Sequence, residues 1–289
     1  IWSASLQAAK GTTPGQLERV TADSNGKRRL TVAANGSRLA YVCYGPPVQG
    51  NVEVRVREIA TGRESLIAGT GKWPYFDPIL SPDGSKLAYM DRHEGKLVTY
   101  VAESGSTSGR AVCEGCVVHA FFPNPSEALV QVENRIMRHR LDGGGQVLLA
   151  QIPSFVDLAL SPDGNRLAFT QARQDGTAAL YQTDITHPQS PPESWKLVAE
   201  DRNHLGSPAW SPDGRLLYYV SQRDGSPCIW AQPVAPDGKL VGAATAVLHL
   251  HSGNGSIARP TINIRVTTDR LFVLLTEVKG DVWSINLER

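Results

Sequence analysis

The chain has no excess of charge of one sign. Its 289 residues include 29 Lys and Arg against 28 Asp and Glu, which leaves a formal net charge of +1. Proteins that bind nucleic acids use clustered basic side chains to neutralise phosphates, and these totals provide no such basic field. We therefore expect no nucleic-acid partner for this segment.

Long apolar runs are missing too. The longest dense run, residues 271–275, has the length of one strand, whereas a membrane-spanning helix needs about 20 apolar residues. The apolar spacing typical of helices is absent almost everywhere. We expect no transmembrane segment in this chain. It starts with IWSASL, which alternates as a strand does and has no initiator Met or signal sequence, so we expect a fragment of a longer polypeptide.

Motifs of common enzyme classes are also lacking. The G-x-S-x-G motif of α/β-hydrolases does not occur, because GSTSG at residues 105–109 has Thr107 at its centre. No glycine-rich phosphate loop, H-E-x-x-H motif or kinase signature is found. The sequence therefore predicts a protein that is not an enzyme, with no cofactor and no metal site.

What the chain does contain is an internal repeat. Three near-copies, SPDGSKLAYM, SPDGNRLAFT and SPDGRLLYYV, begin at Ser81, Ser161 and Ser211, and weaker copies begin at Ala34, Asn124 and Thr267. The spacing of roughly 40 to 54 residues is that of one four-stranded propeller blade. In each strong copy Pro, Asp and Gly favour a tight turn, and a buried strand follows.

This pattern predicts an all-β fold, a β-propeller of four-stranded blades. Six blades fit best, within one domain of residues 1–289. The sixth blade would take three strands from residues 257–289, including residues 281–288, while residues 1–22 close the ring by supplying LERVT as the fourth strand. Seven blades remain the alternative, with residues 1–22 forming the outer half of a blade whose inner half lies outside the segment.

The turn and strand copies resemble the PD40 repeats of TolB-like and WD40-like propellers, over nearly the whole chain. The resemblance implies a non-catalytic sensing or binding module, the C-terminal domain of a bacterial regulatory or envelope protein, located in the periplasm or otherwise outside the cytoplasm. A protein or a small polar ligand would bind at the loop face or channel mouth. The alternatives are the substrate-gating propeller of an oligopeptidase, or a lyase or hydrolase acting on polysaccharide.

Aligning the repeats places one polar residue per blade six residues before the turn Asp, on the strand that should line the channel. This channel ring consists of Arg29, Asp77, His119, Asp157, Ser207 and Arg259. Polar residues are also expected wherever inner strands begin in solvent. The functional interpretation is a mixed-charge ring that binds a small polar or zwitterionic ligand, or a peptide end. Trp73 and Tyr75 are candidate aromatic contacts.

Cysteine is scarce, with four residues in the chain. Cys113 and Cys116 form a CEGC motif, for which a local disulfide, two free thiols and an incomplete zinc site with His119 are all open. A disulfide would suit the periplasm.

Overall fold

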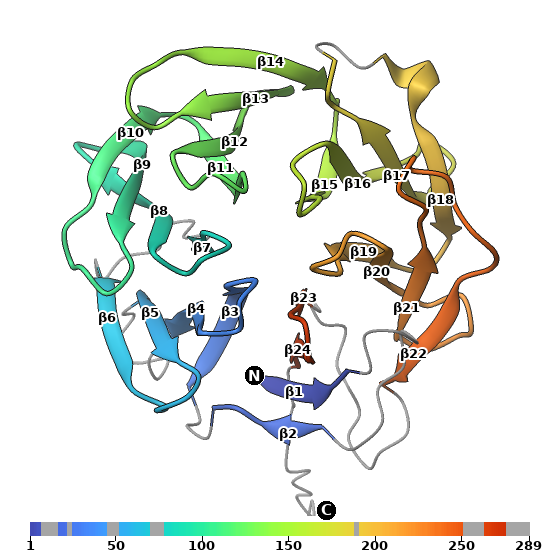
Figure 1. Ribbon diagram of the computed structural model, residues 1–289, viewed down its shortest axis with the longest axis horizontal. Helices are drawn as coiled ribbons and strands as arrows, with labels where there is room; N and C mark the ends of the chain where they lie inside the picture. The colour runs from blue at the N-terminus through green and yellow to red at the C-terminus, as the bar shows by residue number, and fades with distance from the viewer. Residues whose placement is uncertain are drawn as a thin grey trace, which may run out of the picture.

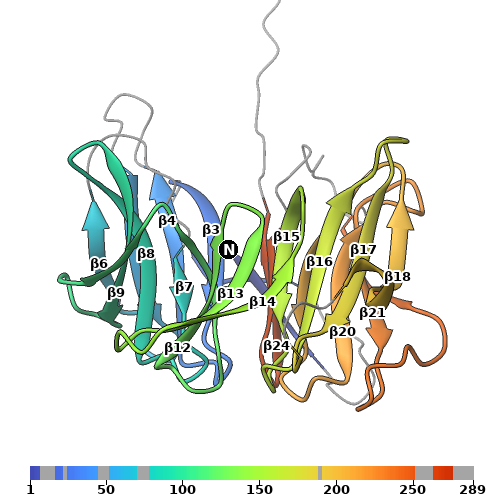
Figure 2. The same ribbon diagram turned by 90° about the horizontal axis from the view of Figure 1, so that it is seen from above.

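Six four-stranded antiparallel sheets surround a central axis, as Figure 1 shows, and this confirms the predicted propeller with six blades. The computed structural model describes residues 1–6, 17–21, 25–44, 52–69, 78–187, 191–250 and 263–275. Seen from the side in Figure 2, the strands of opposite blades rise on either side of the axis. Among the described residues, no helix has the length and apolar character needed to cross a bilayer.

The blades follow chain order, and the first strand of blades 1 to 5 is the innermost. Blade 1 comprises β3 (Gly26–Val32), β4 (Arg38–Tyr44), β5 (Val52–Glu58) and β6 (Glu64–Gly69). Blade 2 comprises β7 (Ile79–Leu80), β8 (Lys86–His93), β9 (Lys96–Glu103) and β10 (Arg110–Glu114). Blade 3 comprises β11 (Val117–Phe121), β12 (Glu127–Val132), β13 (Arg135–Arg140) and β14 (Gln146–Gln151).

The second half of the ring repeats this arrangement. Blade 4 comprises β15 (Phe155–Leu160), β16 (Arg166–Ala172), β17 (Ala178–Asp184) and β18 (Lys196–Asp201), with the short 3-10 helix η1 (Pro192–Ser194) before β18. Blade 5 comprises β19 (Leu205–Trp210), β20 (Leu216–Ser221), β21 (Cys228–Pro233) and β22 (Thr245–His249). Blade 6 joins β23 (Asn263–Val266) and β24 (Arg270–Leu274) to β1 (Trp2–Ser5) and β2 (Glu18–Arg19).

Blade 6 closes the ring with strands from both parts of the chain (Figure 1). β1 pairs with β24, with Trp2 opposite Val273, and β2 pairs with the other edge of β1. β23 occupies one edge of β24 and β1 the other, so the third place in blade 6, which was predicted for residues 281–288, is taken by β1. Residues 281–288 themselves lie outside the described residues.

The hydrophobic core lies between the blades. Each of the six clusters of buried apolar residues combines side chains of two neighbouring blades. Val42 and Val54 of blade 1, for example, share a cluster with Leu87 and Tyr89 of blade 2. The second strand of a blade is buried on both faces, which explains runs such as LLYYV in the sequence. Each blade therefore depends on both neighbours for burial.

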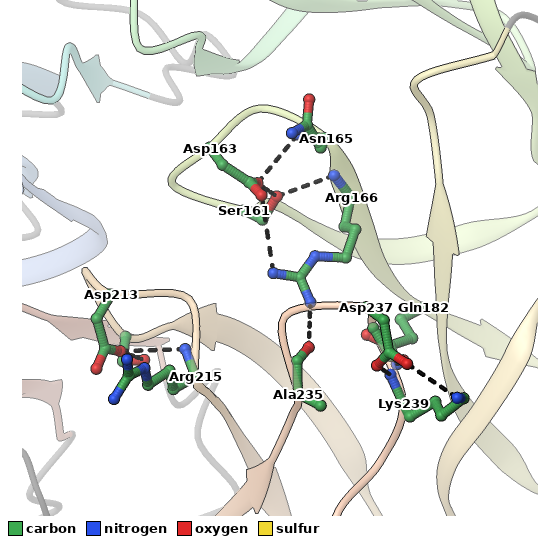
Figure 3. Close-up of polar contacts among 12 residues, drawn as sticks. Ser161, Asp163, Asn165, Arg166, Gln182, Asp213, Arg215, Ala235, Asp237 and Lys239 are labelled. Carbon is green, nitrogen blue, oxygen red and sulfur yellow. Dashed lines mark hydrogen bonds and ion pairs between the residues drawn. The ribbon is translucent and has the colours of Figure 1, made fainter.

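The repeat turns are held by their own side chains. The Ser161 hydroxyl donates to the Asp163 carboxylate, which also accepts the Asn165 backbone N–H at 3.1 Å (Figure 3). In two of the three weaker copies an asparagine takes this place: Asn35 Oδ1 accepts the Ser37 N–H at 2.9 Å, and Asn124 Oδ1 accepts the Ser126 N–H at 3.0 Å. The turn acids therefore have a sufficient structural role.

A buried arginine links blade 4 to blade 5. Arg166 is 8% exposed, and its Nη1 donates to the Ala235 carbonyl at 3.3 Å (Figure 3). Its guanidinium lies 3.8 Å from Asp163 and 5.0 Å from the centroid of the Trp210 ring. Arg38 has the equivalent place in blade 1 and donates to backbone carbonyls of blade 2. Blades 1 and 4 thus each place an arginine where they meet the next blade.

Replacing Arg166 by alanine should lower the free energy of unfolding by about 2 kcal/mol, because a charged hydrogen bond and a cation–π contact are lost. The control is Arg215→Ala, at an exposed side chain of the next repeat turn, which should change stability by less than about 0.5 kcal/mol. Urea unfolding measures both. Equal effects of the two substitutions would show that Arg166 does not link the blades.

Deleting residues 1–21 should expose the edge of β24 and promote association, because an unpaired strand edge invites pairing with another chain. We expect oligomers or aggregates by size-exclusion chromatography with light scattering. A synthetic peptide of residues 1–21 should restore the molar mass measured for the full chain. A monomeric deletion variant with unchanged urea unfolding would contradict the role assigned to β1.

Candidate functional site

A cavity of about 300 Å³ occupies one part of the central channel. Four members of the predicted channel ring line it, each from the inner strand of a different blade: Arg29 on β3, His119 on β11, Asp157 on β15 and Ser207 on β19. The other two members, Asp77 and Arg259, lie outside the described residues, as do Trp73 and Tyr75. Residues almost 180 positions apart in the sequence thus share one cavity wall.

A shift in strand register accompanies each of these four residues. On β3 the register changes between Arg28 and Thr31, so that Arg29 and Leu30 lie opposite a single residue of β4. The inner strands β11, β15 and β19 show the same one-residue excess at their ring positions. A bulge of this kind redirects a side chain, here toward the channel. Outermost strands such as β6 and β14 also contain bulges, so a bulge is not specific to the ring positions.

Two ring residues also have unusual backbone conformations. Arg29 has a φ of 57° and Ser207 a φ of 51°, both in the left-handed region that favours glycine. A non-glycine residue there costs roughly 1 kcal/mol or more, and such residues cluster at binding sites. The fold therefore holds these two residues in place against a local energetic preference.

Asp157 is fixed by contacts within and between blades. Its backbone N–H donates to the Thr170 hydroxyl at 3.1 Å, and its Oδ2 accepts the Ser207 backbone N–H at 2.9 Å. A Cβ on Gly206 would lie 2.9 Å from the same Oδ2, so a larger residue at this position would displace the carboxylate. The carboxylate therefore joins β15 to β19 on one side of the cavity.

His119 deviates by one residue from the predicted ring. Asn124 takes the place of the turn Asp in blade 3, so His119 lies five residues before it and Val118 lies six before it. His119 still lines the cavity, where its Nε2 lies 2.7 Å from Gln131 Oε1. The Gln131 amide nitrogen donates to the Glu133 carbonyl, which leaves Oε1 as the acceptor and makes His119 Nε2 the donor.

The repeat alignment did not identify two polar residues of β23 that line the cavity. Asn263 lies six residues before Asp269 on β23, so it, rather than Arg259, has the ring position in blade 6. Counting back from Asp269 would have found it. Arg265 also lines the cavity, although the equivalent residues of blades 4 and 5, Ala159 and Ala209, are apolar. No repeat signal marks that arginine.

Comparison with known proteins identifies structures that share the fold of this chain. No family model matches the chain. A segment of 66 residues is 44% identical to the Tol-Pal system protein TolB of Bordetella avium, and this covers 22% of the chain and 14% of that protein. The crystal structure of TolB from Acinetobacter baumannii superposes with a TM-score of 0.64 at 14% identity, covering 87% of this chain and 64% of that one. The chain has the fold of a TolB β-propeller.

Other propellers share this TolB-like fold. A structure assigned to TolB of Agrobacterium tumefaciens has a TM-score of 0.64 at 15% identity, covering 96% of this chain and 98% of that chain. An oligogalacturonate lyase in complex with manganese has a TM-score of 0.51 at 16% identity, covering 77% of this chain and 69% of the lyase. Identities this low establish the fold alone.

A disulfide joins Cys113, on β10, to Cys116, directly before β11, in this TolB-like propeller. The disulfide lies where the chain passes from the outermost strand of blade 2 to the innermost strand of blade 3. Cys116 is three residues before His119 in the sequence. Cys43 and Cys228 are buried cysteines that lie outside this disulfide. Within the described ranges, no three side chains of His, Cys, Asp or Glu are grouped to hold a metal ion.

The left-handed conformation of Arg29 predicts a reversal in the effects of alanine and glycine. At this position Arg29→Gly should be more stable than Arg29→Ala by about 1 kcal/mol, since glycine adopts a positive φ without strain. At Arg28, which precedes it on β3 outside the left-handed region, the glycine variant should be less stable by roughly 0.5 to 1 kcal/mol. Urea unfolding of the four variants measures both differences. The same order at both positions would contradict the strained conformation.

Proposed function

We propose that this TolB-like propeller is a recognition or sensing module that binds a small polar or zwitterionic ligand, or a peptide end, at the channel ring. One observation carries the proposal: charged and polar residues from separate blades line a single cavity, some of them at strained backbone positions. Closely placed ionic groups on rigid strands favour charge-assisted hydrogen bonds with a ligand. Recognition of this kind requires no catalytic group.

The module would serve as the C-terminal domain of a bacterial regulatory or envelope protein, outside the cytoplasm. The disulfide between Cys113 and Cys116 supports an oxidising compartment, since such bonds are rare among cytosolic proteins. The resemblance to PD40 propellers supports the same location. A protein partner at the loop face is compatible with this role, because the outer loops and the channel are separate surfaces.

A polysaccharide lyase is the second candidate, favoured by the similarity to the manganese-bound oligogalacturonate lyase. His119 and Asp157 would be its available polar groups, together with Asp77 outside the described residues. The gating propeller of an oligopeptidase has no comparable residue-level support, since a gate is defined by the hydrolase attached to it.

Calorimetric titration with amino acids, dipeptides, neutral sugars and galacturonate oligosaccharides with Mn²⁺ tests the proposal. We expect a polar or zwitterionic compound to bind, and Asp157→Asn to weaken it by about tenfold or more, because a charged partner is lost while an oxygen remains for the Ser207 N–H.

The matched control is Asp175→Asn, at an exposed hairpin where Asp175 accepts the Thr177 N–H at 2.9 Å. This variant should bind as the wild type does. If no compound binds, or if both variants bind equally well, the ring is not the binding site. Cleavage of the oligosaccharide would support the lyase instead.

A further inference from the structure

The channel contains a second cavity with a different character. It has a volume of about 200 Å³ and lies next to the repeat turns, where it is lined by Pro82, Pro123, Pro162 and Pro212. Apolar side chains from the inner strands, including Leu160 and Trp210, complete much of its wall. We call it the apolar compartment and call the cavity at the channel ring the polar compartment.

The two compartments adjoin each other. Ile79, His119, Leu158, Pro208 and Arg265 line both of them. Of these, Ile79 and Leu158 are only partly buried, so their apolar surface is available within the channel. The channel wall therefore becomes more apolar toward the repeat turns, and His119 and Arg265 lie where the two compartments meet.

The polar compartment has a basic side and an acidic side. Arg29 and Arg265 lie on β3 and β23, which contact each other at the junction of blades 1 and 6. Asp157 lies on β15 in blade 4, and blade 4 stands opposite blade 1 across the ring (Figure 1). A ligand in this compartment thus meets cations on one side and a carboxylate on the other.

We propose that the channel binds a free α-amino acid or a short peptide that carries an apolar side chain. The ligand carboxylate lies on the side of Arg29 and Arg265, and the ammonium lies on the side of Asp157. The apolar side chain enters the apolar compartment between Ile79 and Leu158. This inference rests on the proposed function and adds the class of ligand that the ring selects.

The physical reason is the combination of walls. A carboxylate and an ammonium in one small molecule match charges on opposite walls, and Asp157 retains acceptor sites beyond the one used by Ser207. Apolar walls favour an apolar group because its surface leaves water there. A neutral sugar satisfies neither requirement.

Calorimetric titration of the full chain with matched probes tests the inference. L-Leucine should bind at least about tenfold more tightly than L-alanine, because three more carbon atoms are buried. It should also bind more tightly than 4-methylpentanoate, which lacks the ammonium, and isopentylamine, which lacks the carboxylate, by about tenfold each. Comparison of L-leucine with L-leucyl-L-leucine then shows whether a free amino acid or a peptide fits better.

Substitutions in the apolar compartment test whether the apolar side chain of the ligand binds there. Leu158→Asn should remove the preference for L-leucine over L-alanine while L-alanine still binds. Ile79→Asn, in another blade, should do the same and serves if the first variant fails to fold. The control is Leu66→Asn on the outermost strand β6, where Leu66 is 51% exposed, and it should keep the preference.

The outcomes separate this inference from the proposed function. If L-leucine and L-alanine bind equally well, and Asp157→Asn loses the binding of both, the ligand side chain does not enter the apolar compartment. The channel ring would still be the binding site. If Leu158→Asn and Ile79→Asn both keep the preference for L-leucine, the apolar compartment does not bind the side chain either. If only a sugar or another polar compound binds at the ring, the ligand class is wrong. If nothing binds, the proposed function fails as well.

Discussion

Each blade buries apolar surface against both of its neighbours, so the core of this propeller is complete only when the ring is closed. The pairing of β1 with β24 is the contact that closes it, since it supplies blade 6 with its outer half. Arg270 strengthens this closure by donating to the Ser3 hydroxyl at 3.1 Å, and its Nη1 also lies 3.3 Å from Glu18. Because burial of apolar surface is the dominant favourable term in folding, the closure affects every blade.

Ring closure also creates the channel. It brings the inner strands of separate repeats together and places their polar residues around one cavity. Bulges direct these side chains inward, and hydrogen bonds such as that from Ser207 to Asp157 fix adjacent strands to each other. A site on closed, interlocked strands is preorganised, so a ligand would lose little free energy in ordering it.

The charges within the ring are distributed unevenly. Basic residues lie at the junction of blades 1 and 6, and Asp157 lies opposite, while the turn acids are engaged in their own loops. The hydrogen bond from the Ser81 hydroxyl lowers the pKa of Asp83, although partial burial acts in the other direction. The Asp83 carboxylate therefore stays ionised at neutral pH as part of the turn. The turn acids thus have a structural role, whereas Asp157 lines the channel cavity.

The repeat determined much of this protein by itself. Near-identical SPDG turns established the blades, and counting back from the turn placed Arg29, Asp157 and Ser207 on the channel wall, because a repeat encodes the geometry within each blade. Tertiary structure decided what joins the blades: the place of β1, the contact of Arg166 with Ala235, and the presence of Arg265 in the cavity. These features depend on pairing between distant segments and on side chains that vary from one repeat to the next, so local patterns carry no signal for them.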